Sequence, residues 1–261
     1  MPKVSTLPDV LDVRDPQGVA GVGREVREHG MALVLGADSR RAVLRLAEKL
    51  MATRPHPDAD PDGATVIHDI GAQAHTPGYA GLGAGELLHH TERSQLPYPP
   101  RLMLLVCVTP ATSGGECRLV DGRAVLADLA HRSPDAAHAL AAPRSAFFGR
   151  GDGHLGSVFA RVNPGHWAIR LRQDELARFS PAAHLHLALL REVIEENTVT
   201  VETSPGCGYV IDNHRWLHAR AAFTGDRTML RVLGDPLPRL ALRAGFTPAV
   251  PRDGALATVA G

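Results

Sequence analysis

The apolar positions of this chain fall mostly in short runs that glycine and proline separate. The clearest run is residues 101–108, which follows Pro97, Pro99 and Pro100. It carries β-forming residues in its second half and does not alternate with polar positions, which is typical of a strand buried on both faces. The same reasoning predicts shorter strands at residues 117–120, 198–202, 209–212 and 228–232, and near Val158 and residues 168–171.

Helical spacing of apolar residues appears in four other places. Residues 40–52 are predicted to form a helix that Asp38 or Ser39 can cap, and Pro55 follows its end. Residues 1–36 indicate a short strand or a helix pair. Three further helices are expected at residues 123–130, 134–140 and 181–196, the last with Leu185, Leu189, Val193 and Glu196 at helical spacing.

Residues 55–85 show no sustained period and are rich in glycine, proline, aspartate and histidine. They predict a long loop, and long loops in compact domains are usually functional or mobile. Because this segment leads into His90, we expect it to act as a mobile lid over an active site. His68 and His75 within it are expected to be solvated loop residues.

The mixture of short strands, turns and a few helices indicates an α+β, mainly β fold. A β-sandwich or jelly roll with flanking helices is the expected architecture. The chain shows no internal repeat and no linker, so we expect residues 1–261 to form one domain.

Composition excludes several classes of function. Lys+Arg and Asp+Glu both number 28, so the formal net charge is zero and no nucleic-acid partner is indicated. The apolar run at residues 102–108 is too short to cross a bilayer, and the N-terminus has no apolar signal segment. Cys107, Cys117 and Cys207 are an odd number without a close pair, which indicates reduced thiols in a cytoplasmic protein.

A histidine and a carboxylate lie two residues apart at His90 and Glu92. On an extended segment they point to the same face, and the distant His218 can supply a third ligand. Two histidines and one carboxylate leave three positions open on an octahedral ion, which is the facial triad of non-haem Fe(II) oxygenases. His-x-Glu alone is weakly specific in a chain with 14 histidines.

Two arginines follow His218 at Arg227 and Arg231. On one strand they would share a face with Met229 and stand about 13 Å apart, at roughly 3.3 Å per residue. One guanidinium can bind a dicarboxylate cosubstrate in a bidentate way while the other holds a second anionic group. A solvated strand face is the alternative, because exposed arginines are common.

Other residues compete for the metal-ligand roles. His89 would face the opposite side of the strand from Glu92, so we do not expect it to bind the metal. His214 and His218 are spaced like a helical zinc pair, but the His-Glu-x-x-His motif is missing. Asp212 is more typical of a turn or of a carboxylate that supports a ligand. Glu92 by itself could be an ordinary surface acid.

In combination, these features resemble the taurine dioxygenase/clavaminate synthase-like superfamily over roughly residues 30–235. With glutamate rather than aspartate at position 92, the chain resembles the clavaminate synthase and amino-acid hydroxylase branch of that superfamily. The resemblance is carried by His90-Thr91-Glu92, Pro100-Arg101-Leu102, Gly114-Gly115, residues 208–220, residues 223–227 and Arg231.

The resemblance implies a double-stranded β-helix, that is, a distorted jelly roll, and dependence on Fe(II), 2-oxoglutarate and O2. It makes His90, Glu92 and His218 the iron ligands. Arg227 would bind the distal carboxylate of 2-oxoglutarate, and Arg231 would lie at the substrate end.

One position departs from the family pattern in a way that matters for the cosubstrate. After the Gly-Gly turn the family often has a threonine that helps to hold the cosubstrate carboxylate, whereas this chain has Cys117. A thiol is a weaker donor than a hydroxyl. Cosubstrate binding would therefore be looser unless a neighbour such as Ser113 compensates. Ala219 also stands where glycine is usual.

The expected activity is hydroxylation of a free amino acid or a small amino-acid-derived metabolite, with release of succinate and CO2. The branch resemblance favours a specialised biosynthetic pathway. Retention of Glu92 argues against halogenation, for which related enzymes leave that ligand position vacant, while desaturation and cyclisation stay open. A zinc-dependent hydrolase on the same ligands and a non-catalytic jelly-roll binding protein are the alternatives.

Overall fold

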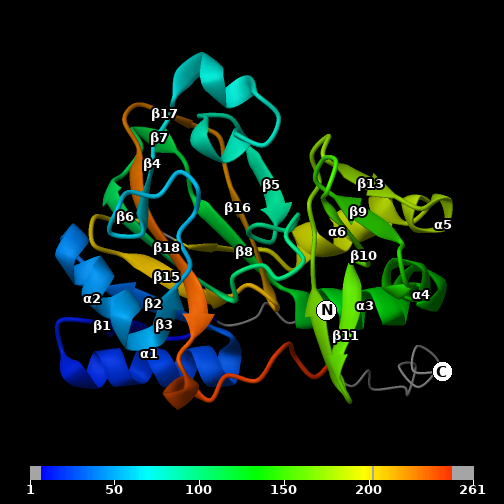
Figure 1. The fold of residues 1–261 in the computed structure, drawn as a ribbon, viewed down its shortest axis with the longest axis horizontal. Helices are drawn as coiled ribbons and strands as arrows, with labels where there is room; N and C mark the ends of the chain where they lie inside the picture. Colours follow the sequence, from blue (N-terminus) through cyan, green and yellow to red (C-terminus); the bar gives the residue numbers. More distant parts are fainter. Residues whose placement is uncertain (1–6, 202, 249–261) are drawn as a thin grey trace.

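Two β-sheets packed face to face form the centre of the protein (Figure 1). The computed structural model describes residues 7–201 and 203–248. The larger sheet has seven strands in the order β1-β2-β15-β6-β18-β3, with β4 paired to β18. These strands are β1 (Val10–Asp12), β2 (Met31–Leu35), β3 (Met51–Thr53), β4 (Ala64–Ile67), β6 (Leu102–Thr109), β15 (Gly208–Asp212) and β18 (Thr228–Pro236).

The smaller sheet has four strands in the order β14-β8-β16-β5. Its strands are β14 (Val199–Val201), β8 (Cys117–Asp121), β16 (Trp216–Arg220) and β5 (Leu87–His90). A short antiparallel pair, β7 (Ser113–Gly114) with β17 (Phe223–Thr224), continues the pairing of β8 with β16 beyond the ends of those two strands. The strand predicted at residues 198–202 is β14, and Glu202 lies outside the described residues.

Apolar side chains from both sheets meet in one cluster between them. Met103 and Tyr209 come from the larger sheet, and Leu119 and Trp216 come from the smaller one. The first six residues of β6 are buried, as expected for a strand covered on both faces. This arrangement of facing sheets is that of a jelly roll.

Two helices cover the outer face of the larger sheet: α1 (Pro16–His29) and α2 (Arg40–Leu50). Ser39, one of the two predicted caps, accepts a hydrogen bond from the backbone N–H of Ala42 and so begins α2. The buried residues of α2 recur at helical spacing and so form an apolar face. This face packs on β6 and β18.

A second layer covers the outer face of the smaller sheet, on the right of Figure 1. Val120 of β8 and Leu217 of β16 pack into it. It contains α3 (Gly122–Arg132), α4 (Pro134–Ala141), α5 (Pro181–His184), α6 (Leu187–Glu196), β9 (Ala146–Phe148), β10 (His154–Gly156), β11 (Phe159–Asn163), β12 (His166–Ile169) and β13 (Ala177–Phe179). A 3₁₀ helix, η3 (Pro238–Leu240), follows β18. None of the helices described within residues 7–201 and 203–248 is both long and apolar enough to cross a bilayer.

Two sequence predictions about secondary structure were wrong. The helix predicted at residues 181–196 is divided into α5 and α6, and Leu185 between them is 79% exposed, so its helical spacing did not indicate burial. Residues 55–85 are not one continuous loop, because β4 (Ala64–Ile67) pairs with β18. The segment also contains the 3₁₀ helices η1 (Gly71–His75) and η2 (Ala80–Leu82). Its pairing partner lies over 160 positions away, so local periodicity could not reveal this strand.

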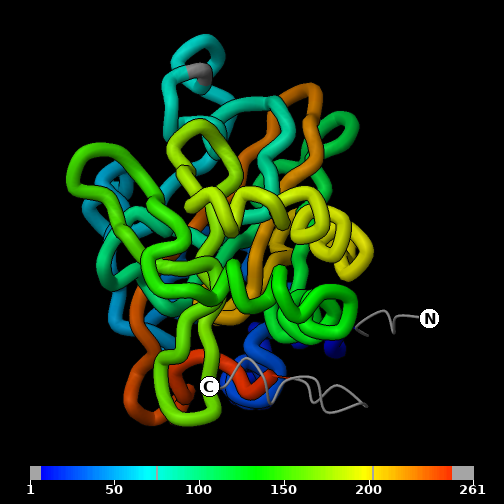
Figure 2. The backbone as a smooth tube through the Cα atoms, turned by 90° about the vertical axis from the view of Figure 1, so that its right-hand side faces the viewer, coloured from blue at the N-terminus to red at the C-terminus, as the bar shows by residue number. Residues whose placement is uncertain are grey.

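The part of that segment that follows β4 stands at one end of the molecule in both Figure 1 and Figure 2. A single buried arginine fastens its last part. Arg220 of β16 donates hydrogen bonds to the carbonyl oxygens of Gly81 (3.2 Å), Gly83 (2.5 Å) and Gly85 (2.5 Å). Whether this segment moves as a lid stays a prediction.

We expect Arg220→Gln to loosen the segment without unfolding the sheets. Hydrogen bonds from a charged donor contribute roughly 1.5–3 kcal/mol each, so amide exchange over residues 80–86 should accelerate roughly tenfold or more. Hydrogen exchange with mass spectrometry measures this, with β6 peptides as the internal control. Unchanged exchange over residues 80–86 in the variant would show that Arg220 does not hold the segment.

Candidate metal centre

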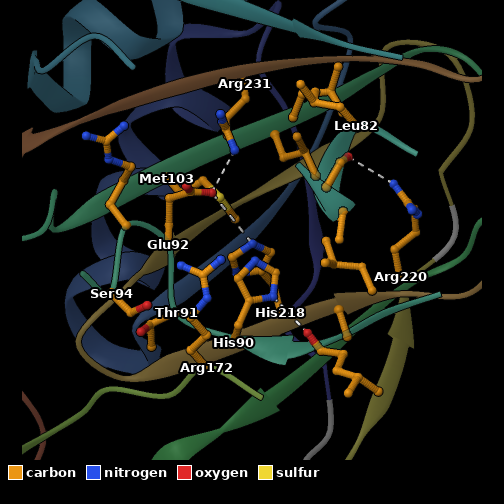
Figure 3. A pocket seen from close by; sticks show the side chains of 18 of the residues that line it. Leu82, His90, Thr91, Glu92, Ser94, Met103, Arg172, His218, Arg220 and Arg231 are labelled. Atoms are coloured by element: carbon orange, nitrogen blue, oxygen red, sulfur yellow. Dashed lines mark hydrogen bonds and ion pairs between the residues drawn. The ribbon is translucent and has the colours of Figure 1, made fainter. Parts of the chain in front are cut away.

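The three predicted metal ligands come together in the structure. Ligand atoms of His90, Glu92 and His218 all lie within 4.8 Å of one another. His90 ends β5 and pairs directly with His218 of β16 in the antiparallel register. Their ring centroids are 4.1 Å apart, and both side chains face Glu92 (Figure 3).

Each histidine has at least one ring nitrogen available to a metal, and Nδ1 of His218 makes no hydrogen bond with the described residues. His90 Nδ1 lies 2.8 Å from the carbonyl oxygen of Leu88 and donates to it, since a carbonyl can only accept. That contact fixes the tautomer and leaves Nε2 unprotonated for a metal. His218 Nε2 lies 3.9 Å from a Glu92 carboxylate oxygen.

Glu92 lies just beyond the end of β5, and the amide of Asn213 fixes its backbone. The Glu92 N–H donates to Asn213 Oδ1 (2.7 Å), and Asn213 Nδ2 donates to the carbonyl oxygens of Glu92 and Pro100 (both 2.9 Å). The Asn213 side chain therefore positions the carboxylate at the point where regular strand pairing stops. Sequence reasoning did not assign this role, although Asp212-Asn213 at the end of a predicted strand was a signal for it.

Burial and neighbouring charges shift the pKa values of all three groups. Burial alone would raise the pKa of Glu92, but Arg231, His218 and His90 outweigh it and hold that pKa at about 2. Burial lowers the pKa of His90 and takes that of His218 well below its ordinary value. The site at neutral pH thus offers one carboxylate and two neutral imidazoles, the forms that bind a metal.

Arg231 forms an ion pair with the predicted ligand Glu92, at 2.8 Å from Nη1 to Oε2 (Figure 3). This contact was not expected from the sequence, which assigned Arg231 to the substrate end. The arginine also lines the cavity described below, so both contacts are available to one guanidinium. The alternative of a solvated strand face is wrong, because its side chain is 13% exposed.

Arg227 and Cys117 form a second group that lines the same cavity. Arg227 Nη2 lies 3.6 Å from Cys117 Sγ. Gly115 has φ 78° and sits so close to the Arg227 side chain that a Cβ would stand 3.0 Å from Arg227 Cδ. Glycine at the turn therefore leaves room for the arginine. Arg227 precedes β18, whose pairing is shifted at Thr228/Met229, so the two arginines do not lie on one regular strand as predicted.

A cavity of about 470 Å³ joins the two groups. This volume suits a small ligand, since such sites usually measure about 300–1,000 Å³. Residues of the segment fastened by Arg220, among them Tyr79 and Leu82, form one wall. Its charged lining consists of Asp58, Glu86, Glu92, Asp174, Arg93, Arg172, Arg220, Arg227 and Arg231.

The competing histidines are accounted for by other contacts. His89 points away from the centre, and its Nε2 lies 3.0 Å from the Thr198 hydroxyl. Burial lowers the pKa of His89 to about 3, with Arg118 acting in the same direction. His214 lies in the turn before β16, so it makes no helical pair with His218. His56, which the sequence did not single out, lines the cavity, whereas His68 does not.

The donor set fits iron(II), because two imidazole nitrogens and one carboxylate on one side of a cavity form a facial triad. We expect His90→Ala, Glu92→Ala and His218→Ala each to lose bound iron while remaining folded. Metal analysis after loading with Fe(II) measures the loss, and His89→Ala is the matched control. Retention of iron by His90→Ala together with its loss in His89→Ala would reverse the assignment of the two histidines.

Comparison with known proteins agrees with this geometry. Residues 3–233 match the model of the family described as taurine catabolism dioxygenase TauD, TfdA family. A uridine-5'-phosphate dioxygenase from Amycolatopsis sp. is 26% identical over 91% of this chain and 95% of its own length. Among solved structures, asparagine oxygenase is similar with a TM-score of 0.69 at 20% identity, covering 84% of this chain and 78% of its own. The non-haem iron oxygenase OrfP is similar with a TM-score of 0.66 at 19% identity, covering 90% and 89%.

These structural likenesses confirm the predicted fold, a mainly β, distorted jelly roll with flanking helices. The family match spans most of the sequence and covers residues 30–233 of the region of resemblance, roughly residues 30–235. The chain belongs to the TauD/TfdA dioxygenase family.

Proposed function

We propose that this protein is an Fe(II)- and 2-oxoglutarate-dependent oxygenase that hydroxylates a small anionic metabolite, in the first place an amino acid or an amino-acid derivative. The observation that carries the proposal is the buried triad of His90, Glu92 and His218 sharing one cavity with Arg227. Asparagine oxygenase has been solved with Fe(II), hydroxyasparagine and succinate, and OrfP with Fe, succinate and hydroxyarginine. Those ligands support the same cofactors and a related substrate class for this chain.

The residues of the cavity would divide the work between them. His90, Glu92 and His218 would hold the iron, which when bound supplies the oxidation of substrate by O2 coupled to conversion of 2-oxoglutarate into succinate and CO2. Arg227 would bind the distal carboxylate of 2-oxoglutarate, since a guanidinium matches a carboxylate in a bidentate way. Glu92 retains its place in the triad, which favours hydroxylation over halogenation.

Arg231 would serve both the metal ligand and the substrate. Its single hydrogen bond among the described residues goes to Glu92, and its Nε is buried without a partner. A guanidinium has five N–H donors, so most of them remain for an anionic group of the substrate. Arg220 would hold the wall formed by residues 81–85 in place and keep water from the reacting groups.

A nucleoside monophosphate is a second candidate substrate class. It is favoured by the near full-length similarity to a uridine-5'-phosphate dioxygenase. The five arginines in the cavity lining suit a phosphate as well as a carboxylate. The two classes differ in the ammonium group, which an amino acid would place against an acid such as Asp58 or Asp174.

Two wider expectations from the sequence belong with this proposal. We infer a cytoplasmic location, because the three cysteines are all free thiols. We infer a small-molecule substrate, with no nucleic-acid or membrane partner. A zinc hydrolase and a purely binding role gain no support from the family match.

Succinate formation tests the proposed function. Purified protein with Fe(II), 2-oxoglutarate and O2 should release more succinate when its substrate is present, and separate panels of amino acids and nucleoside monophosphates identify the class. Glu92→Ala protein, which is expected to lose iron, is the control for succinate formed without the metal centre. If succinate from the unmodified, Fe(II)-loaded protein never exceeds that of the control, with or without an added substrate, the result would count against an oxygenase.

Arg227→Ala should weaken 2-oxoglutarate binding, because the distal carboxylate would lose a charge-assisted, bidentate partner. Such contacts contribute roughly 1.5–3 kcal/mol each, so we expect the KM for 2-oxoglutarate to rise at least about tenfold. Arg227→Lys should recover only part of this, since an ammonium cannot reproduce the planar fork. An unchanged KM in the alanine variant would reject the role.

A further inference from the structure

The Arg227 end of the cavity lacks the hydroxyl that the family usually supplies there. Cys117 occupies the expected position and lies 3.6 Å from Arg227, but a thiol donates only weakly. Ser113 was the expected substitute. Its hydroxyl instead pairs with the Thr224 hydroxyl at 2.7 Å on an exposed strand pair, outside the residues that line the cavity.

A different hydroxyl is available at this place. Tyr209 of β15 lines the cavity and is 1% exposed, and no oxygen or nitrogen within residues 7–201 and 203–248 partners its buried hydroxyl. The Cys117 thiol beside it is only a weak acceptor. Burial raises the pKa of Tyr209 well above the ordinary value, with Cys117 acting in the same direction and Arg227 opposing it. The hydroxyl therefore stays protonated as a donor, and it lies near both members of the Arg227–Cys117 group.

A buried hydroxyl without a strong acceptor is unfavourable, because folding removes it from water without replacing the hydrogen bond that it made there. Phenylalanine would fit the surrounding apolar cluster, which includes Met103, Leu119 and Met229, without that penalty. A tyrosine at this position is accounted for if a ligand accepts its hydrogen bond. The neighbouring guanidinium favours an anionic ligand atom, because it carries a positive charge and can only donate hydrogen bonds.

We propose that the Tyr209 hydroxyl donates to the distal carboxylate of the 2-oxo acid cosubstrate, beside Arg227, and replaces the hydroxyl that Cys117 lacks. The inference rests on the proposed function for the identity of the cosubstrate. It assigns Tyr209 as a binding residue and leaves Cys117 as a small apolar neighbour.

Two cosubstrate probes test the assignment by direct binding. Anaerobic calorimetry on the Fe(II)-loaded protein compares 2-oxoglutarate with 2-oxobutyrate, which lacks the distal carboxylate. Tyr209→Phe should weaken 2-oxoglutarate binding roughly tenfold, the effect of one hydrogen bond to a charged group, and leave 2-oxobutyrate binding unchanged. Tyr98→Phe is the matched control, because Tyr98 is 82% exposed and does not line the cavity.

Variants of Cys117 keep the test decisive if Tyr209→Phe is unstable. Cys117→Val should bind 2-oxoglutarate within about twofold of the unmodified protein, since the thiol contributes little. Where Tyr209→Phe is stable, Cys117→Thr added to it should recover much of the lost affinity by restoring a hydroxyl beside Arg227.

The outcomes separate the two proposals. Equal affinity of Tyr209→Phe and the unmodified protein for 2-oxoglutarate, or a tenfold loss in Cys117→Val, would overturn the role of Tyr209 alone. Absence of 2-oxoglutarate binding by the unmodified, Fe(II)-loaded protein would overturn the proposed function itself. An equal loss for both probes in Tyr209→Phe would indicate a packing role for the ring and also overturn the assignment.

Discussion

The burial of the Glu92 carboxylate is the constraint around which the site is built. A carboxylate removed from water is strongly unfavourable unless cations and donors surround it. Here Arg231 forms an ion pair with it at 2.8 Å, and two imidazoles face it. Its pKa of about 2 shows that these neighbours outweigh the effect of burial, so the group stays charged at any pH where the protein would work. A divalent cation between the carboxylate and the imidazoles would complete the compensation.

The surrounding fold keeps that carboxylate and its partners in fixed positions. His90 and His218 pair across β5 and β16, while Asn213 fixes the backbone of Glu92 at the end of β5. At the start of β16, Arg215 forms a bidentate pair with Asp121 of β8, at 2.7 and 3.0 Å. Trp216 Nε1 donates to the carbonyl oxygen of His29 at the end of α1 (2.9 Å). The smaller sheet is thus bonded to α1, which covers the larger sheet. These contacts help to hold the metal ligands of the smaller sheet in place.

The features of the fold and the site that depend on local sequence could be predicted from the sequence. The two-residue spacing of His90 and Glu92, the burial of β6 and the capped helix α2 each follow from period and residue type. The opposite orientation of His89 follows from the alternation of a strand. His218 was named because a facial triad needs a second histidine, and the family resemblance supported that choice. Its separation of 128 residues from His90 carries no local signal.

Other features could not be predicted, because they depend on strand pairing between distant parts of the chain or on which of several polar partners a side chain contacts. The strand β4 exists because β18 offers it an edge. Arg231 contacts Glu92, and the Ser113 hydroxyl pairs with Thr224 outside the cavity. Both contacts depend on which partner the folded chain places beside each side chain. Asn213 was visible in the sequence, but its role needed the knowledge that Glu92 and Pro100 lie beside it.

The central claim is that one buried centre binds iron(II) and 2-oxoglutarate together. Anaerobic titration of 2-oxoglutarate into the Fe(II)-loaded protein tests it most directly, with visible absorption as the readout. We expect a weak charge-transfer band that saturates with 2-oxoglutarate and does not form when Zn(II) replaces Fe(II). Tight binding of Fe(II) with no band at any concentration of 2-oxoglutarate would contradict it.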